Sequence, residues 1–301
     1  MATQNSNSDV ALNLPLGVTL SIGEVLFTVA IAAMVKLIAN DISVFMILFF
    51  RYLLCIPLLL LTATIQRGTA AFRVQDKAKL ALRSAMGLGS FGCLFAALQT
   101  IDLSKMTALL QTIPIFVTLL APILLGETVG WRRRIAVLIG FVGAVLIVDP
   151  SNADWLNKGV LLGIASPFFG ALMLLTLRRL GQTDHPSTTA LWYNIIGAAV
   201  FFGVCLSLDI PMPEAKNIVL ILCIIGVMSS FQQFFLAHSY KLAPASILAP
   251  LRYLSVPFGV GASVAFFDET LTSSFFVGTA ILVSASFFIL KRSEKIKAKS
   301  Q

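Results

Sequence analysis

Ionisable side chains are scarce inside the apolar stretches of this 301-residue chain, and the few that occur there are the first candidates for chemistry. A charged group within a membrane-spanning segment costs about 2.5–3.5 kcal/mol on insertion scales, so its presence points to a function. Among the acids, Glu24 alone lies well inside such a stretch, and among the basic residues only Arg51 and Arg252 do. With five nearby polar or aromatic residues they form the predicted binding set: Glu24, Arg51, Gln111, Tyr193, Asn194, Gln232, Arg252 and Tyr253.

These residue types favour the binding of a charged organic solute. The planar fork of an arginine pairs with a carboxylate or phosphate group through two parallel hydrogen bonds. Two interior arginines against one glutamate leave one positive charge in excess, which favours an anionic or zwitterionic ligand. Glu24 either receives an amine of the ligand or takes up a proton during coupling, and the sequence leaves both options open. In the empty state it can also pair with Arg252. For the amide side chains, hydrogen bonding between helices is the alternative role.

The composition shows what kind of protein must position these residues. Hydrophobic types make up 57% of the chain and charged types 12%, whereas soluble domains carry about 25% charged residues. Together with a mean hydropathy of +0.91, this excludes a soluble enzyme, a nucleic-acid-binding domain and a disordered chain. The net charge of +8 falls in short clusters between apolar runs, which indicates contact with a lipid bilayer surface rather than with nucleic acid.

A membrane-spanning helix needs about 20 mostly apolar residues. Ten windows of the sequence meet or nearly meet that length, and the fifth is the weakest because three arginines occupy its first turn. The predicted spans are 17–38, 43–64, 80–99, 106–125, 131–149, 159–179, 188–208, 217–239, 244–266 and 272–291.

The distribution of Lys and Arg predicts the orientation. With the N-terminus inside, sixteen of these residues fall on the cytoplasmic side and four outside. Both termini are therefore expected in the cytoplasm, with the chain in an inner membrane of bacterial type. At about 1.5 Å per residue, Glu24 and Arg252 then lie about 10 and 12 Å from the inner face, so they can pair. Arg51 lies about 12 Å from the outer face.

The two halves of the chain match each other at one constant offset, the one that carries Gly17 onto Gly159. GVTLSIGEVLF from Gly17 aligns with GVLLGIASPFF from Gly159, and much later Glu127 and Thr128 align with Glu269 and Thr270 without a shift. The predicted organisation is a polar tail over 1–16, repeats over 17–150 and 157–291, and a basic tail over 292–301. Five spans per repeat is an odd number, so the second repeat must enter the membrane from the opposite side. Inverted repeats are typical of secondary transporters, which bind solute at the repeat interface. A duplication kept only for packing is the alternative.

Glu127 and Glu269 stand at predicted helix ends, on opposite faces of the membrane. For both, we expect capping of the next helix in the chain, or an interaction with its dipole.

At these residues the chain resembles the drug/metabolite transporter superfamily, specifically its EamA-type ten-helix members, over residues 17–291. The stretch ALLQTIPIFVTLLAPILLGETVGWRRRIAVLIGFVGAVLIV carries the family pattern of a helix proline, an apolar run, Gly-Glu, a turn and a glycine-rich helix. In the second copy, Asp268 replaces the glycine, Pro257 is shifted by one position, and Gly278 is the one glycine left in the last helix. The resemblance implies a ten-helix secondary transporter of small organic solutes, often an exporter.

The sequence thus predicts an all-α membrane protein with ten transmembrane helices, arranged as two inverted five-helix repeats around a central cavity. The expected function is secondary transport of a small carboxylate-bearing or zwitterionic metabolite by export or exchange. The alternatives are an exporter of amphipathic drugs or nucleotide-like or vitamin-like metabolites, and a lipid scramblase or non-transporting membrane partner. No catalytic motif, cofactor motif or metal-ligand spacing is found in the sequence, and a homodimer is left open.

Overall fold

The computed structural model describes residues 13–125, 129–149, 157–181, 183–243, 247–248 and 251–297, and within these ranges every regular element is helical. The elements of the first repeat are α1 (Leu14–Leu37), α2 (Val44–Arg67), η1 (Gly68–Phe72), α3 (Lys77–Ala97), α4 (Leu103–Leu109), η2 (Leu110–Thr112), α5 (Ile113–Leu125) and α6 (Trp131–Val148). Those of the second repeat are α7 (Lys158–Leu180), α8 (Pro186–Ser207), α9 (Lys216–Leu242), η3 (Arg252–Leu254), α11 (Ser255–Phe267) and α12 (Ser273–Lys297).

The protein is an all-α membrane protein. Seven of its described helical segments are long and apolar enough to cross a bilayer: α1, α2, α3, the run from α4 into α5, α7, α8 and α9. The helices α6 and α12 and the segment that contains η3 and α11 complete the ten spans. The weakest predicted window, 131–149, is α6, which places its three arginines in the first turn and buries one of them, Arg133.

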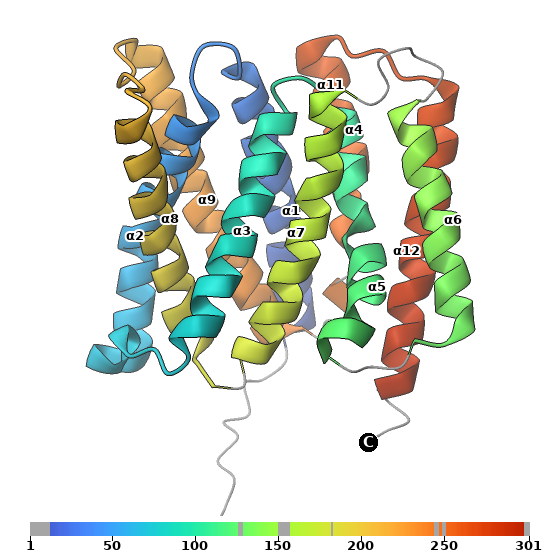
Figure 1. Ribbon diagram of the computed structural model, residues 1–301, viewed down its shortest axis with the longest axis horizontal. Coiled ribbons are helices and arrows are strands. Elements are labelled where there is room, and N and C mark those ends of the chain that lie inside the picture. Colours follow the sequence, from blue (N-terminus) through green and yellow to red (C-terminus); the bar gives the residue numbers. More distant parts are fainter. Residues whose placement is uncertain are drawn as a thin grey trace, which may run out of the picture.

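The helix boundaries repeat at the offset found in the sequence. Helix α2 begins at Val44 and its counterpart α8 at Pro186; α6 begins at Trp131 and its counterpart α12 at Ser273. In both pairs the difference in residue number equals that between Gly17 and Gly159. The packing repeats as well, because α3 lies along α7 and its counterpart α9 lies along α1. Helix α1 begins and α12 ends at the same end of the bundle (Figure 1). The ten helices therefore form two inverted five-helix repeats.

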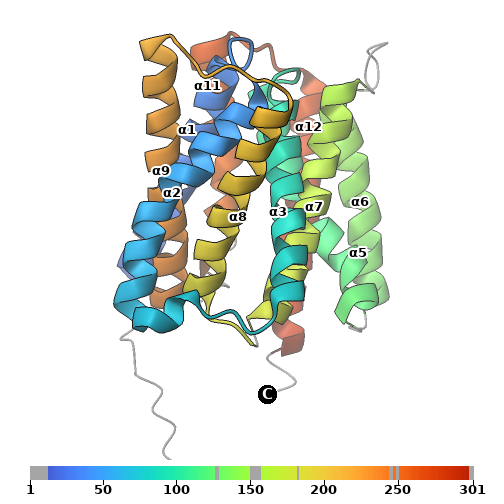
Figure 2. The ribbon, with the colours of Figure 1, turned by 60° about the vertical axis from the view of Figure 1, so that its left-hand side comes forward.

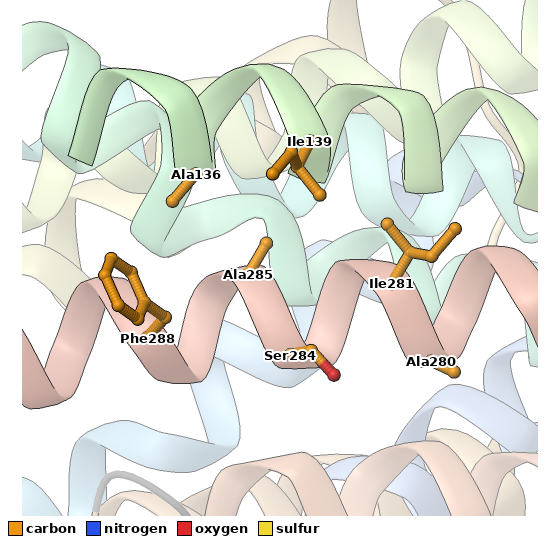
Figure 3. A pocket seen from close by; sticks show the side chains of 7 residues that line it. All are labelled: Ala136, Ile139, Ala280, Ile281, Ser284, Ala285 and Phe288. Atoms are coloured by element: carbon orange, nitrogen blue, oxygen red, sulfur yellow. The ribbon is translucent and has the colours of Figure 1, made fainter. Parts of the chain in front are cut away.

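One edge of the bundle is formed by α6 and α12, and the opposite edge by α2, α8 and α9 (Figures 1 and 2). Gly143 of α6 and Gly278 of α12 bring the two backbones together, since a Cβ atom built on either glycine would lie 2.7 Å from the carbonyl oxygen of the other. The single glycine left in the last helix is thus sufficient for close packing. A groove of about 460 Å³ runs along this pair (Figure 3) and contains none of the predicted binding residues: it is lined by Ala136, Ile139, Ala280, Ile281, Ser284, Ala285 and Phe288.

Two spans are interrupted at equivalent places. The short 3₁₀ turns η2 and η3, which start at Leu110 and Arg252 and so keep the same offset, separate α4 from α5 and precede α11. Pro114 and Pro257 lie two to three residues after these turns, and a proline disfavours α-helix in the residue before it and removes a helical hydrogen bond. Three of the predicted binding residues, Gln111, Arg252 and Tyr253, lie on the two turns.

Candidate functional site

The predicted pair of Glu24 and Arg252 is present. Nη2 of Arg252 lies 3.9 Å from Oε1 of Glu24, although the two residues belong to different repeats. The Glu24 side chain is 2% exposed and that of Arg252 is 46% exposed. The acid is therefore enclosed by helices, and the guanidinium group remains accessible from one side.

Two further polar residues complete this cluster. Oε1 of Glu24 accepts a hydrogen bond from the Thr28 hydroxyl at 3.2 Å, and Nε2 of Gln232 donates to the same hydroxyl oxygen at 2.8 Å. Glu24 and Thr28 are four residues apart and so lie on one face of α1. The cluster thus joins α1, α9 and η3.

Arg51 and Tyr193 belong to a second group, between α2 and α8. The guanidinium carbon of Arg51 lies 3.8 Å from the centre of the Phe91 ring and 5.0 Å from that of Tyr52. The hydroxyl groups of Tyr52 and Tyr193 are hydrogen-bonded at 2.7 Å. Arg51 is 2% exposed and Tyr193 is 3% exposed.

Asn194 borders this second group and has its own set of hydrogen bonds. Its amide nitrogen donates to the carbonyl of Ala190, one turn earlier in α8, at 2.9 Å and to Oε1 of Gln233 in α9 at 3.3 Å. Gln233 in turn donates to the sulfur of Cys55 in α2 at 3.3 Å. Since these contacts join α8 to α9 and α2, they fit the packing role that the sequence left as an alternative for the amides.

Gln111 has its own hydrogen bonds, and Tyr253 directly follows Arg252 on η3. Nε2 of Gln111 donates to the hydroxyl of Ser255 at 2.7 Å, and its backbone carbonyl accepts a hydrogen bond from Ser286 at 2.9 Å. The hydroxyl of Tyr253 is buried, and within the described residues it has no hydrogen-bond partner. The eight predicted residues therefore do not form one contact group: Glu24, Gln232 and Arg252 belong to one cluster and Arg51 and Tyr193 to another, while Asn194, Gln111 and Tyr253 lie outside these two.

The structure adds Arg83, a residue that the sequence predicts as a charge on a cytoplasmic loop. Arg83 lies in the second turn of α3, is 8% exposed, and places its guanidinium carbon 3.8 Å from the centre of the Tyr193 ring. Helix α3 begins at Lys77, three residues before the predicted window, so Arg83 lies deeper than that window implied. The available signal was its spacing from Gly87, which is four residues later on the same face and also contacts Tyr193.

The start of α3 is held firmly by two aspartates. Asp76 caps the helix by accepting a hydrogen bond from the Lys79 amide at 2.9 Å. Asp184, between α7 and α8, accepts hydrogen bonds from the amides of Gln75 and Asp76 at 2.7 and 3.0 Å. These contacts fix the position of Arg83 relative to α8.

Glu269 caps a helix as predicted, but the prediction that this helix is the next one in the chain was wrong. The carboxylate caps α4 of the other repeat instead of α12, by accepting hydrogen bonds from the backbone amides of Leu103 and Ser104 at 2.7 and 3.2 Å. It also lies 2.9 Å from Nζ of Lys36. The reason is that the chain between α11 and α12 lies beside the exposed N–H groups at the start of α4. Glu127, the corresponding residue of the first repeat, lies outside the described residues.

Comparison with known proteins agrees with this architecture. A riboflavin transporter of Vibrio cholerae is 33% identical over 189 residues, and the match spans 62% of this chain and 62% of that transporter. An uncharacterized transporter of Helicobacter pylori is 30% identical over 277 residues, which cover 88% of this chain and 93% of that protein. One solved crystal structure has the same fold, with a TM-score of 0.62 and 16% identity over 92% of this chain and 98% of that chain.

The family model points to the same conclusion. The model described as the EamA-like transporter family matches twice, over residues 15–149 and 157–291, and so covers both repeats. Family and relatives are transporters rather than enzymes. This chain belongs to the EamA-like transporter family.

Proposed function

We propose that this protein is a secondary transporter that moves a small carboxylate-bearing or zwitterionic metabolite, such as an amino acid, by alternating access. The transport direction under this proposal is export or exchange. The protein lies in the cytoplasmic membrane with both termini in the cytoplasm. Residues 17–150 and 157–291 act as the two moving repeats, and tails 1–16 and 292–301 flank them.

The pairing of Glu24 with Arg252 is the observation that carries this proposal. The two side chains bring opposite charges together at the boundary of the repeats, where secondary transporters bind their solutes. Arg252 lies on the interrupted span at η3, and interrupted helices commonly form such sites. A guanidinium group has five N–H donors, so it can hold Glu24 and a ligand carboxylate together.

A vitamin-like metabolite is the second candidate solute. The relative from Vibrio cholerae is named a riboflavin transporter. The aromatic side chains around Arg51 support this candidate, because a planar ring system stacks well on them. An exporter of amphipathic drugs and a lipid scramblase are the remaining alternatives.

The test is solute flux in vesicles that contain the purified protein. A thermal-shift screen against amino acids, organic acids and riboflavin first identifies a ligand that stabilises the folded protein. Counterflow of that ligand is then compared between wild type, Arg252→Gln and the control Arg179→Gln, which removes the same charge from an exposed position near the end of α7.

For a carboxylate solute we expect Arg252→Gln to reduce flux about tenfold or more, since a charge-assisted hydrogen bond is lost, and Arg179→Gln to leave it unchanged. Unchanged flux of an anionic solute in Arg252→Gln would remove the carboxylate from the proposal. Movement of a fluorescent phospholipid without any solute flux would favour the scramblase instead.

A further inference from the structure

We propose that Arg51 and Arg83, together with the hydroxyl groups of Tyr52 and Tyr193, form a binding site for the carboxylate or phosphate group of the transported solute. This inference rests on the proposed transport function and names the groups that hold the anion. Arg83 stands at its centre, although the sequence prediction did not include it.

Both guanidinium groups are buried and keep N–H donors that have no hydrogen-bond partner. Arg51 is 2% exposed and Arg83 is 8% exposed, and within the described part of the chain Nε and Nη1 of each make no hydrogen bond. In that same part, no carboxylate lies within 4.0 Å of either group; the glutamate in the spans, Glu24, pairs with Arg252 instead. Buried charges in proteins are normally paired, so two arginines without acids indicate that an anion supplies the missing charge.

The aromatic rings contact both guanidinium groups but do not supply the missing hydrogen-bond acceptors. Phe91 lies 3.8 Å from the guanidinium carbon of Arg51, and Tyr193 lies at the same distance from that of Arg83. The electron-rich face of an aromatic ring attracts the positive charge of a guanidinium group that lies over it. The N–H donors point outward in the plane of the group, and these are the atoms that a carboxylate or phosphate binds.

The two arginines are connected through the tyrosine pair. Tyr193 carries Arg83 on its ring and shares a hydrogen bond of 2.7 Å with the hydroxyl of Tyr52, whose ring lies beside Arg51. In such a pair one hydroxyl donates and the other accepts, so the accepting hydroxyl keeps its own proton to give to a ligand. Three groups with donors left for a ligand, the two guanidinium groups and one tyrosine hydroxyl, therefore lie around the tyrosine pair between α2, α3 and α8.

This region lies near the middle of the bundle in depth, that is, along the helix axes. Arg83 comes six residues after the start of α3 and Arg51 seven residues after the start of α2, and the two helices run in opposite directions. At about 1.5 Å per residue the arginines are about 9 and 10 Å from opposite ends, which leaves about 10 Å of depth between them in a hydrocarbon core of about 30 Å. An anion at this position is near the midplane, as solutes of inverted-repeat transporters are.

The site is not a by-product of the duplication. At the offset that relates the two repeats, Arg51 corresponds to Tyr193 and Arg83 corresponds to Ile225. Helix α2 packs closely along α9, whereas the counterpart pair α8 and α3 touches much less. The arginine that bridges α3 and α8 thus occurs only in the first repeat, at the less closely packed of two equivalent seams.

The experiment measures binding of matched anionic and neutral ligands to the purified full-length protein by thermal shift. One pair is riboflavin 5′-phosphate and riboflavin, and the other is indole-3-acetate and indole-3-acetamide, so the two arms separate phosphate from carboxylate. The variants are Arg51→Gln, Arg83→Gln and Arg83→Met, with Arg179→Gln as the control that removes an exposed arginine.

We expect the wild type and Arg179→Gln to prefer the anion in at least one pair, and this preference to fall about tenfold or more in Arg51→Gln and Arg83→Gln. Without ligand, Arg83→Gln and Arg83→Met should unfold at the same temperature as the wild type or at a higher one, because they remove an unpaired buried charge. A structural role of Arg83 predicts the opposite, a lower unfolding temperature with the anion preference intact.

The proposal is overturned if the wild type prefers neither anion to its neutral partner, or if Arg83→Gln retains the preference. Solute flux measured on the same preparations reports separately on the proposed transport function. Anion binding that depends on Arg83 in a protein without flux would contradict transport and leave this site in place.

Discussion

Oε1 of Glu269 lies 2.9 Å from Nζ of Lys36, and this ion pair joins the second repeat to the first. The side chains are 5% and 17% exposed, so both charges are largely removed from solvent. The same carboxylate accepts hydrogen bonds from the amides of Leu103 and Ser104, and Lys36 also donates to the carbonyl of Ile101 at 2.8 Å. One acid thus holds three segments of the chain together at one end of the bundle.

Replacing Glu269 by Gln should destabilise the protein by about 1–3 kcal/mol, because Lys36 and one backbone amide lose their acceptor in a buried setting. Thermal unfolding in detergent measures the change. The control is Lys105→Met, which removes the more exposed ion pair with Asp102 and should cost less than about 1 kcal/mol. Equal effects of the two substitutions would contradict a special role for Glu269.

The same carboxyl predicts a pH dependence. Burial by itself raises the pKa of Glu269, but the hydrogen bonds from Lys36, Leu103 and Ser104 outweigh burial and hold the pKa below its ordinary value. Its contribution to stability is therefore complete above the ordinary glutamate pKa of about 4.3 and is lost as the pH falls through the lowered value. The difference in unfolding temperature between wild type and Glu269→Gln should stay constant from neutral pH to about pH 5 and shrink below about pH 4. A difference that shrinks already near neutral pH would show that another group is responsible.

Substituting Glu24 by Gln should separate zwitterionic from simple anionic solutes. Gln retains an oxygen that accepts from Thr28, so the helix contacts persist, while the negative charge that would receive a solute amine is lost. We expect amino-acid flux to fall about tenfold and flux of a carboxylate without an amine to change little. Asp41→Asn, which removes an exposed acid between α1 and α2, serves as the control. Equal losses for both solutes would assign Glu24 to the positioning of Arg252.

Adding one methyl group to Gly278 should disrupt the pairing of α6 with α12. The Cβ atom would lie 2.7 Å from the carbonyl oxygen of Gly143 and 2.8 Å from the amide nitrogen of Ile147, and neither backbone atom can move aside easily. We expect Gly278→Ala to cost about 1–3 kcal/mol of unfolding free energy. Gly203→Ala, whose Cβ meets no atom within 4 Å, should instead stabilise α8 by up to about 1 kcal/mol. A neutral Gly278→Ala would mean that the two helices are free to separate.

The sequence was sufficient to predict the fold because hydrophobic length and the repeat offset are properties of the chain alone. The ten windows required only counting apolar residues, and the offset that carries Gly17 onto Gly159 recurs in the first residues of η2 and η3 and of α5 and α11. The interruptions themselves were not predicted, although Pro114 and Pro257 marked the places.

Contacts between elements distant in sequence were harder to predict. The partner of Glu269 does not follow from the order of helices in the chain, because the start of α4 comes close to Glu269 only in three dimensions. A charge near the end of a span, such as Arg83, is expected to stay with the lipid headgroups, whereas here its guanidinium group packs on the ring of Tyr193 in the other repeat. The Glu24–Arg252 pair was predictable because depth along a helix follows directly from residue number.

The cap on α4 has a mechanical consequence. Helix α4 belongs to the first repeat by sequence, but its first turn is tied to the second repeat through Glu269. If one repeat rocks against the other while this tie holds, the start of α4 must move with the second repeat, as must Lys36 at the end of α1. Within the α4–α5 span, the bending then falls on the three residues of η2. Leu110–Thr112 would then be a hinge inside the membrane, while the hydrogen bonds to Glu269 keep the end of the bundle closed.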